Sequence, residues 1–217
     1  MKNFSLIAAT ALALVLAPAA LALAEGALYV TPKLGFSNVT AKFDDESKSK
    51  NLVPFGLAVG YDFNPVRAEL EYAYRAKKEF FNETEEYGDL SGSLKGKLGV
   101  ETLFLNGYYD IHNSSSITPY VGLGLGLAKL SYEAALDIKA GGSSLYWERL
   151  SGTKTKFAWN IGAGAAWQLS DLLSLDLGYR YADFGKFTVE SGPGFYLDNF
   201  DVKSSAHEVL LGLRFSF

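Results

Sequence analysis

Apolar and polar residues alternate along this chain in eight separate segments. Apolar side chains occupy every second position of each segment, which is the pattern of a β-strand with one face against an apolar medium. The segments are residues 28–36, 55–63, 66–74, 98–111, 117–127, 157–169, 173–181 and 209–217. The pattern predicts an all-β protein with eight strands.

The fourth segment departs from simple alternation. Val100 and Phe104 lie on one parity, whereas Leu103 and Leu105 lie on the other. A β-bulge at residues 101–102 would bring both sets to one face, so we expect a bulge there.

The connections between these segments alternate in length. The second, fourth and sixth segments are followed by short links, at residues 64–65, 112–116 and 170–172. The other links are polar and about 14 to 25 residues long, well beyond an ordinary hairpin loop. This arrangement predicts an eight-stranded antiparallel up-and-down transmembrane β-barrel with periplasmic turns and four long extracellular loops.

Charged residues occupy the faces opposite to the apolar ones. On a lipid-facing surface each basic side chain near the membrane midplane would cost about 2–4 kcal/mol, so these residues are expected in the lumen. The predicted polar network of the lumen consists of Arg67, Glu69, Glu71, Arg75, Asp176, Arg180, Glu208 and Arg214. A soluble lipocalin-like barrel would place its apolar faces inside instead, and the sequence gives that alternative little support.

Small residues share the predicted lumen face with these charges, for example in Gly56-Leu-Ala-Val-Gly60 and Gly122-Leu-Gly-Leu-Gly126. The interior of an eight-stranded barrel is only wide enough to be filled by side chains, so long charged residues on some strands require glycine on others. We interpret the charges as a paired structural plug, with a small channel for small or apolar solutes as the alternative.

The two ends of the chain point to the cell envelope. Lys2, the apolar run 6–16 and Ala22-Leu-Ala24 form a secretory signal peptide, which predicts cleavage of residues 1–24 and a barrel domain over 25–217. A transmembrane helix is the alternative for this segment, although Pro18 interrupts it. At the other end an aromatic-ended strand would be an exposed edge in a soluble protein, whereas a closed barrel has no edge.

Composition narrows the chemistry further. The chain has no cysteine, which excludes disulfides and thiolate sites, and its net charge of −4 argues against a nucleic-acid partner. Ser205 and His207 are the remaining candidates for a lipid A-modifying hydrolase, but Glu208 alternates to the other face and is poorly placed to orient the histidine. We therefore expect no enzymatic activity, no metal site and no cofactor.

Lysines gather in the long links and at the strand ends beside them. Lipopolysaccharide phosphates lie at that depth, so these lysines are candidates for a lipopolysaccharide-binding rim, although long polar links collect lysine in any case. The rim candidates are Lys77, Lys78, Lys95, Lys97, Lys129, Lys154, Lys156 and Lys203. Aromatic residues in the same links, such as Tyr146 and Trp147, are candidates for contact with a host or surface ligand.

Several motifs resemble the OmpA-like and opacity-type outer-membrane barrels of Gram-negative bacteria. They are Asn106-Gly-Tyr-Tyr-Asp110, Thr118-Pro-Tyr-Val-Gly122, Leu177-Gly-Tyr-Arg-Tyr-Ala-Asp-Phe-Gly185 and the final ten residues from Glu208 to Phe217. The resemblance spans nearly the whole chain after residue 24. It does not extend to the peptidoglycan-binding half of the full-length OmpA type, so we do not expect the protein to be anchored to the cell wall.

This resemblance implies a monomeric barrel in the cell outer membrane that acts as a surface antigen, an adhesin or an envelope-stabilising protein. It implies periplasmic chaperones and the outer-membrane assembly machinery as partners, with Phe215 and Phe217 as the assembly signal. Outer-membrane lipids and lipopolysaccharide are the expected lipid partners.

Overall fold

A computed structural model describes residues 27–43, 46–189 and 200–217, and every regular element in these ranges is a β-strand. The signal peptide predicted over residues 1–24 lies outside the described residues. The strands are β1 (Ala27–Phe43), β2 (Glu46–Leu52), β3 (Pro54–Asp62), β4 (Val66–Tyr87), β5 (Leu90–Asp110), β6 (Ile117–Ala140), β7 (Ser143–Ser170), β8 (Leu173–Val189) and β9 (Phe200–Ser216).

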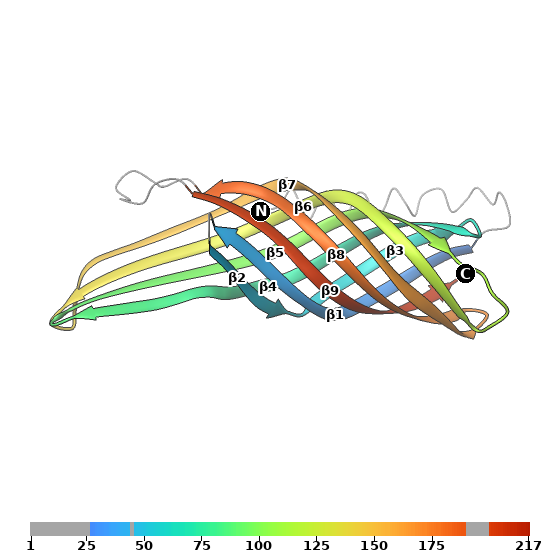
Figure 1. Cartoon of the computed structure of the whole chain (residues 1–217), viewed down its shortest axis with the longest axis horizontal. Helices are drawn as coiled ribbons and strands as arrows, with labels where there is room; N and C mark the ends of the chain where they lie inside the picture. Colours follow the sequence, from blue (N-terminus) through green and yellow to red (C-terminus); the bar gives the residue numbers. More distant parts are fainter. Residues whose placement is uncertain (1–26, 44–45, 190–199) are drawn as a thin grey trace.

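These strands form one antiparallel sheet that closes on itself (Figure 1). The sheet closes where β1 pairs with β9 along most of its length. β2 and β3 occupy one position in the ring, because residues 37–43 of β1 pair with β2 and residues 27–34 of β1 pair with β3. The sheet is thus a ring of eight strands, which confirms the predicted antiparallel up-and-down barrel.

The strands extend much further than the apolar alternation suggested. Much of the sequence expected to form the first three long loops is strand, because β2 follows β1 after two residues and the β4–β5 and β6–β7 hairpins turn only at residues 88–89 and 141–142. Both ends of the fourth expected loop, residues 182–189 and 200–208, are also strand, and residues 190–199 between them lie outside the described residues. Beyond the membrane both faces of a strand touch water, so the ladder of hydrogen bonds persists while the hydropathy period disappears.

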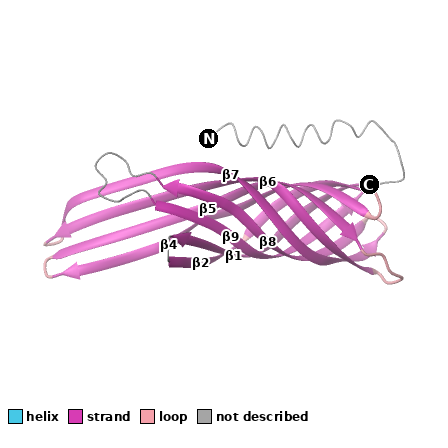
Figure 2. Ribbon diagram, turned by 45° about the horizontal axis from the view of Figure 1, so that its top comes forward, coloured by secondary structure: helices cyan, strands magenta, loops and turns pink. Residues whose placement is uncertain are grey.

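The β4–β7 strands continue beyond the barrel as a four-stranded sheet (Figures 1 and 2). Its base follows one row of paired residues, in which Glu79 is opposite Lys97, Lys97 opposite Glu133, and Glu133 opposite Ser151. We call residues 79–97 and 133–151 the extension.

The bulge expected in the fourth predicted strand lies elsewhere. The register between β4 and β5 shifts on the β4 side, between Arg75 and Lys78 and again between Glu79 and Phe81. β5 itself alternates without interruption, with Val100 and Phe104 pointing inward and Leu105 outward. Residues of both parities are apolar here, because those that point inward pack in the apolar half of the lumen and those that point outward face the lipid.

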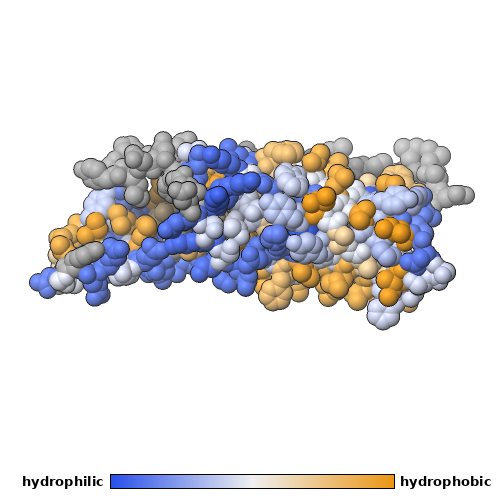
Figure 3. Space-filling model, in the orientation of Figure 1, coloured by the Kyte–Doolittle hydropathy of each residue, from blue (hydrophilic) through white to orange (hydrophobic). Residues whose placement is uncertain are grey.

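Apolar side chains gather on the face of the barrel shown in Figure 3, away from the extension, and exposed apolar residues occur on β1 and on β3 to β9. Leu105, Leu123 and Ile161 are more than half exposed on the outer face of the barrel, and Trp159 and Trp167 lie on the same face near the two ends of the apolar region. An apolar band flanked by aromatic residues is the lipid-facing surface of an outer-membrane barrel. Within the described residues, no helix has the length and apolar composition needed to cross a membrane.

Candidate functional site

Charged side chains fill the inner half of the lumen in pairs. Near the end with the short turns, the guanidinium of Arg67 donates two hydrogen bonds of 2.8 Å to Asp110. Arg214 and Asp176 form a looser pair there, with Nε and Oδ2 3.4 Å apart. All four side chains are buried, so each charge depends on its partner.

A continuous chain of ion pairs lies above these two. Lys33 contacts both Glu69 and Glu71, with 2.7 Å between Nζ and the Glu71 carboxylate. Glu71 also accepts a 2.7 Å hydrogen bond from Arg180, whose Nε donates to Glu208 at 2.7 Å.

Arg75 completes the chain. Its guanidinium donates two hydrogen bonds to Glu208, of 2.6 and 2.9 Å, and a third of 3.2 Å to Thr102. Neither Arg75 nor Glu208 has any exposed surface. A pair this deeply buried is stable only when nearly all of its hydrogen-bonding groups are satisfied, as they are here.

All eight residues expected in the lumen lie there, and the structure adds Lys33 and Asp110. Together these ten residues comprise five basic and five acidic side chains. Lys33 carried a signal in the sequence, since it is a lone lysine in the middle of an apolar strand. We call these ten residues the ionic tier.

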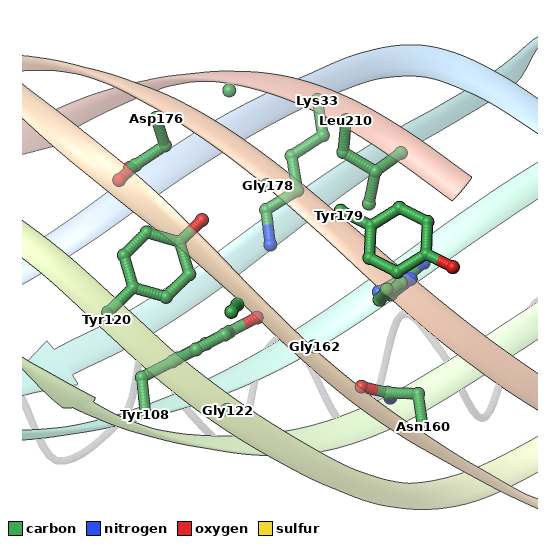
Figure 4. A pocket seen from close by; sticks show the side chains of 13 residues that line it. Lys33, Tyr108, Tyr120, Gly122, Asn160, Gly162, Asp176, Gly178, Tyr179 and Leu210 are labelled. Atoms are coloured by element: carbon green, nitrogen blue, oxygen red, sulfur yellow. The ribbon is translucent and has the colours of Figure 1, made fainter. Parts of the chain in front are cut away.

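Glycines provide the room that the long side chains need. A Cβ built on Gly60 would lie 2.2 Å from the ring of Tyr29, and one built on Gly124 would lie 2.0 Å from Oδ1 of Asn106. Beside the ionic tier a cavity of about 50 Å³ remains, lined by Lys33, Tyr108, Tyr120, Asn160 and Asp176 among others (Figure 4). A space of this volume accommodates a few water molecules.

The outer half of the lumen is packed with apolar side chains. Phe184 lies 5.1 Å from the guanidinium carbon of Arg75, and Phe104 lies 5.6 Å from that of Arg180, so aromatic rings meet the ionic tier directly. We call the following buried residues the apolar tier: Val39, Ala41, Leu52, Phe80, Leu98, Val100, Phe104, Ala128, Leu130, Ala158, Ala182, Phe184, Phe187, Val202 and Ala206.

The lysines expected to form a rim lie at several heights and on both faces of the sheet. Lys129 is largely buried against Glu101, Lys77 pairs with Glu133 at 2.7 Å, and Lys78 donates to the Asn51 carbonyl. Lys154 and Lys156 share the inner parity of β7 with buried Ala158. Lys95, Lys97 and Lys203 are exposed.

Ser205 and His207 lie on the outer face of β9. Nδ1 of His207 is 2.7 Å from the hydroxyl of Tyr179, and the ring packs against Tyr181. Glu208 points into the lumen, toward Arg75 and Arg180. No group of three or more side chains able to hold a metal ion occurs in the described part of the chain.

The tip of the extension is rich in exposed apolar side chains. Leu145 is 65% and Trp147 73% exposed, and Leu90 lies nearby on the other hairpin. Below the tip the surface is charged. The pKa of Glu133 is lowered, first by a hydrogen bond from Lys77 and then by the positive charge of Lys77 and Arg149.

A family model described as an outer membrane protein beta-barrel domain matches residues 7–215. The chain belongs to this family. Outer membrane protein PagN of Salmonella typhimurium is 30% identical to it over 244 aligned residues, which cover 100% of both chains. The resemblance seen in the sequence motifs is thereby confirmed.

Other relatives of this outer-membrane barrel share less sequence. A Rickettsia bellii protein named as a candidate adhesin is 28% identical over 131 residues, covering 59% of this chain and 58% of its own. The crystal structure of Neisserial surface protein A superposes with a TM-score of 0.56 at 19% identity, over 89% of this chain and 100% of that one, which shows the shared fold. The protein is thus a surface barrel of the cell outer membrane.

Proposed function

We propose that this protein is a closed, non-enzymatic barrel that anchors a ligand-contacting surface above the membrane. The proposal is based on the difference between the lumen and the extension. Side chains fill the lumen, whereas the extension rises about 20 Å beyond its base, given eight residues per strand and a tilted barrel wall. A Rickettsia relative named as a candidate adhesin supports a role in surface contact.

The two tiers argue against the channel alternative. The ionic tier crosses the lumen from Lys33 on β1 to Arg180 on β8 through Glu71 on β4. The apolar tier lies above it, and the cavity described beside the ionic tier measures about 50 Å³. An ion would have to displace several paired charges and then pass tightly packed aromatic rings.

Single-channel recording in planar bilayers tests this point. We expect no discrete conductance steps from the purified barrel, with a 16-stranded porin in the same bilayer as the positive control. Reproducible steps that scale with the amount of barrel would favour the channel.

Removing the extension tests the contact role. In a short-hairpin variant, residues 80–96 and 134–150 are each replaced by Asn-Gly, which suits a two-residue β-turn. We expect bacteria carrying this variant to bind cultured epithelial cells and immobilised extracellular matrix no better than bacteria without the protein. Trp167→Phe, at the opposite end of the barrel, is the matched control. Full adherence of the short-hairpin variant at equal surface levels would contradict the proposal.

The hydrolase alternative lacks the geometry of a catalytic base. The Nδ1 atom of His207 is occupied by the Tyr179 hydroxyl, and Glu208 is paired inside the lumen. A histidine base of this kind is most often oriented by a carboxylate within hydrogen-bonding distance. We expect the acylation of lipid A to be unchanged when His207 is replaced by Gln.

The export and assembly of the protein are part of the same proposal. Residues 1–24 are an export signal, residues 25–217 form the mature monomer, and chaperones and the assembly machinery recognise Phe215 and Phe217. Both aromatic side chains are exposed, Phe217 to 76%. Deleting Phe217 is expected to reduce insertion in cells more than refolding into vesicles. Equal surface levels of the deletion variant would contradict this role.

A further inference from the structure

Three lysines lie side by side on the wall of the barrel formed by β8, β9 and β1. The strand register places Lys186 opposite Lys203 and Lys203 opposite Lys42. All three point outward and are exposed. We call them the lysine row. Like charges directly opposite one another in an antiparallel pair are destabilising, so an unoccupied row of this kind is unfavourable.

Carboxylates beside the row neutralise its positive charge only in part. Lys186 pairs with Asp201 at 2.7 Å, and Lys203 lies 3.4 Å from Asp183. The described residues provide no ion pair for Lys42. On the opposite wall the register instead places unlike charges together, with Glu101 opposite Lys129 and Lys97 opposite Glu133.

A β-bulge produces the row. The register between β8 and β9 shifts between Asp183 and Lys186, and Gly185 has a φ of +83°, which favours glycine. The Gly185 amide donates a 2.8 Å hydrogen bond to Asp183. As a result Phe184 and Phe187 both point into the apolar tier, and Lys186 lies on the outer face opposite Lys203.

The outer surface below the row changes from apolar to polar in steps. The first step consists of Tyr179, Val209 and Phe36, all about half exposed or more on the lipid-facing side. The next row carries phenol, imidazole and amide groups, and the row above it carries hydroxyl groups and one carboxylate. They are Tyr181, His207, Asn38 and Asn51, followed by Asp183, Ser205, Thr40 and Ser49.

Each row adds about 5 Å in height, because two residues span roughly 6.6 Å along a strand tilted by about 40°. The lysine row therefore lies about 15 Å above the last apolar row. This order matches a lipid with acyl chains, then hydroxyl and amide groups, then phosphates, since lysine is a common phosphate-binding side chain.

We infer that the wall formed by β8, β9, β1 and β2 is a binding site for a phosphorylated glycolipid of the outer leaflet, with the lysine row on its phosphates. The lipopolysaccharide-binding rim expected from the sequence is thus confined to one wall of the barrel. The site rests on the proposal that lipopolysaccharide surrounds the barrel in the outer leaflet. Of the eight rim candidates only Lys203 belongs to the site, and Lys42 and Lys186 join it.

The test compares two triple variants of the full-length barrel, purified in mild detergent. K42Q/K186Q/K203Q removes the row, and K95Q/K97Q/K139Q removes three exposed lysines of the extension. Native mass spectrometry measures binding of lipid A with both phosphates and of lipid A without phosphates. We expect the row variant to bind phosphorylated lipid A about tenfold more weakly and the control to stay within about twofold of the unmodified protein.

Further variants and ligands distinguish binding by the lysine row from nonspecific binding of anions. K42R/K186R/K203R keeps the charges and is expected to bind as the unmodified protein does, and heat-dependent gel mobility checks that each variant is folded. Equal losses in the two glutamine variants would show a nonspecific charge effect and overturn the inference. So would equal binding of dephosphorylated lipid A, or full displacement by millimolar inorganic phosphate, which would indicate a free anion. Adherence through the extension is measured independently, so its failure leaves this result intact.

Discussion

The two halves of the lumen are filled by different means, and the difference shows what each contributes. In the ionic tier every residue depends on a named partner from another strand, as Arg75 does on Glu208 across the barrel. In the apolar tier, side chains such as Phe104 and Phe187 contact several neighbours and none of them is a unique partner. Loss of one member should therefore be severe in the first tier and more graded in the second.

Removing Glu208 is expected to have the largest effect. Glu208→Ala leaves Arg75 buried without a carboxylate and takes one of two carboxylates from Arg180, so we expect unfolding to become easier by about 3–5 kcal/mol. Urea unfolding in lipid vesicles, followed by tryptophan fluorescence, measures this change. Glu83→Ala, an exposed pair with Lys48, is the control, with an expected change below about 0.5 kcal/mol. Equal losses would remove the distinction between buried and exposed pairs.

A cavity in the apolar tier is expected to cost somewhat less. Phe104→Ala should lower the free energy of unfolding by about 3 kcal/mol, because neighbouring side chains move partly into the space and no charge is left unpaired. Phe104→Leu should recover most of this loss in the same assay. If Phe104→Ala cost more than Glu208→Ala, packing rather than pairing would dominate the lumen.

The looser pair at the inner end of the lumen sharpens the comparison within the ionic tier. Arg214 lies 3.4 Å from Asp176 and its Nε makes no hydrogen bond, so Arg214→Gln should cost about 2 kcal/mol, less than the loss of a well-bonded buried pair. Arg67→Gln breaks the two-bond pair with Asp110 and is the reference for a larger loss at the same depth. Similar values for the two variants would show that burial matters more than hydrogen-bond geometry.

The smallest effect is expected outside the membrane. Lys77 holds the pKa of Glu133 below its ordinary range, so the pair contributes above the unfolded-state pKa and is lost as pH falls through the folded-state value. Lys77→Gln should raise the pKa of Glu133, measured by NMR titration of its carboxyl carbon, with little change in stability. An unchanged pKa would mean that Arg149 or Lys97 sets the charge environment.

The ionic tier was predictable because its charges alternate with lipid-facing residues on the same strands, as Glu69 and Glu71 do with Leu70. The apolar tier was not, because Phe104 points inward while Leu103 and Leu105 point outward, and an apolar residue carries no mark of which side it faces. The extension was missed because water on both faces removes the period. The lysine row depends on the register of three strands and on the bulge at Gly185, neither of which alternation specifies.

The hydrogen bonds between Arg75 and Glu208 join residues 133 positions apart in the chain, so they cannot form until the last strand has arrived. The same strand closes the ring by pairing with β1. Before that moment the guanidinium of Arg75 lacks its carboxylate, and water is a far better partner for it than the membrane interior. Closure of the ring and neutralisation of Arg75 thus depend on the same strand, and a sheet that entered the lipid before closure would carry this arginine without its carboxylate.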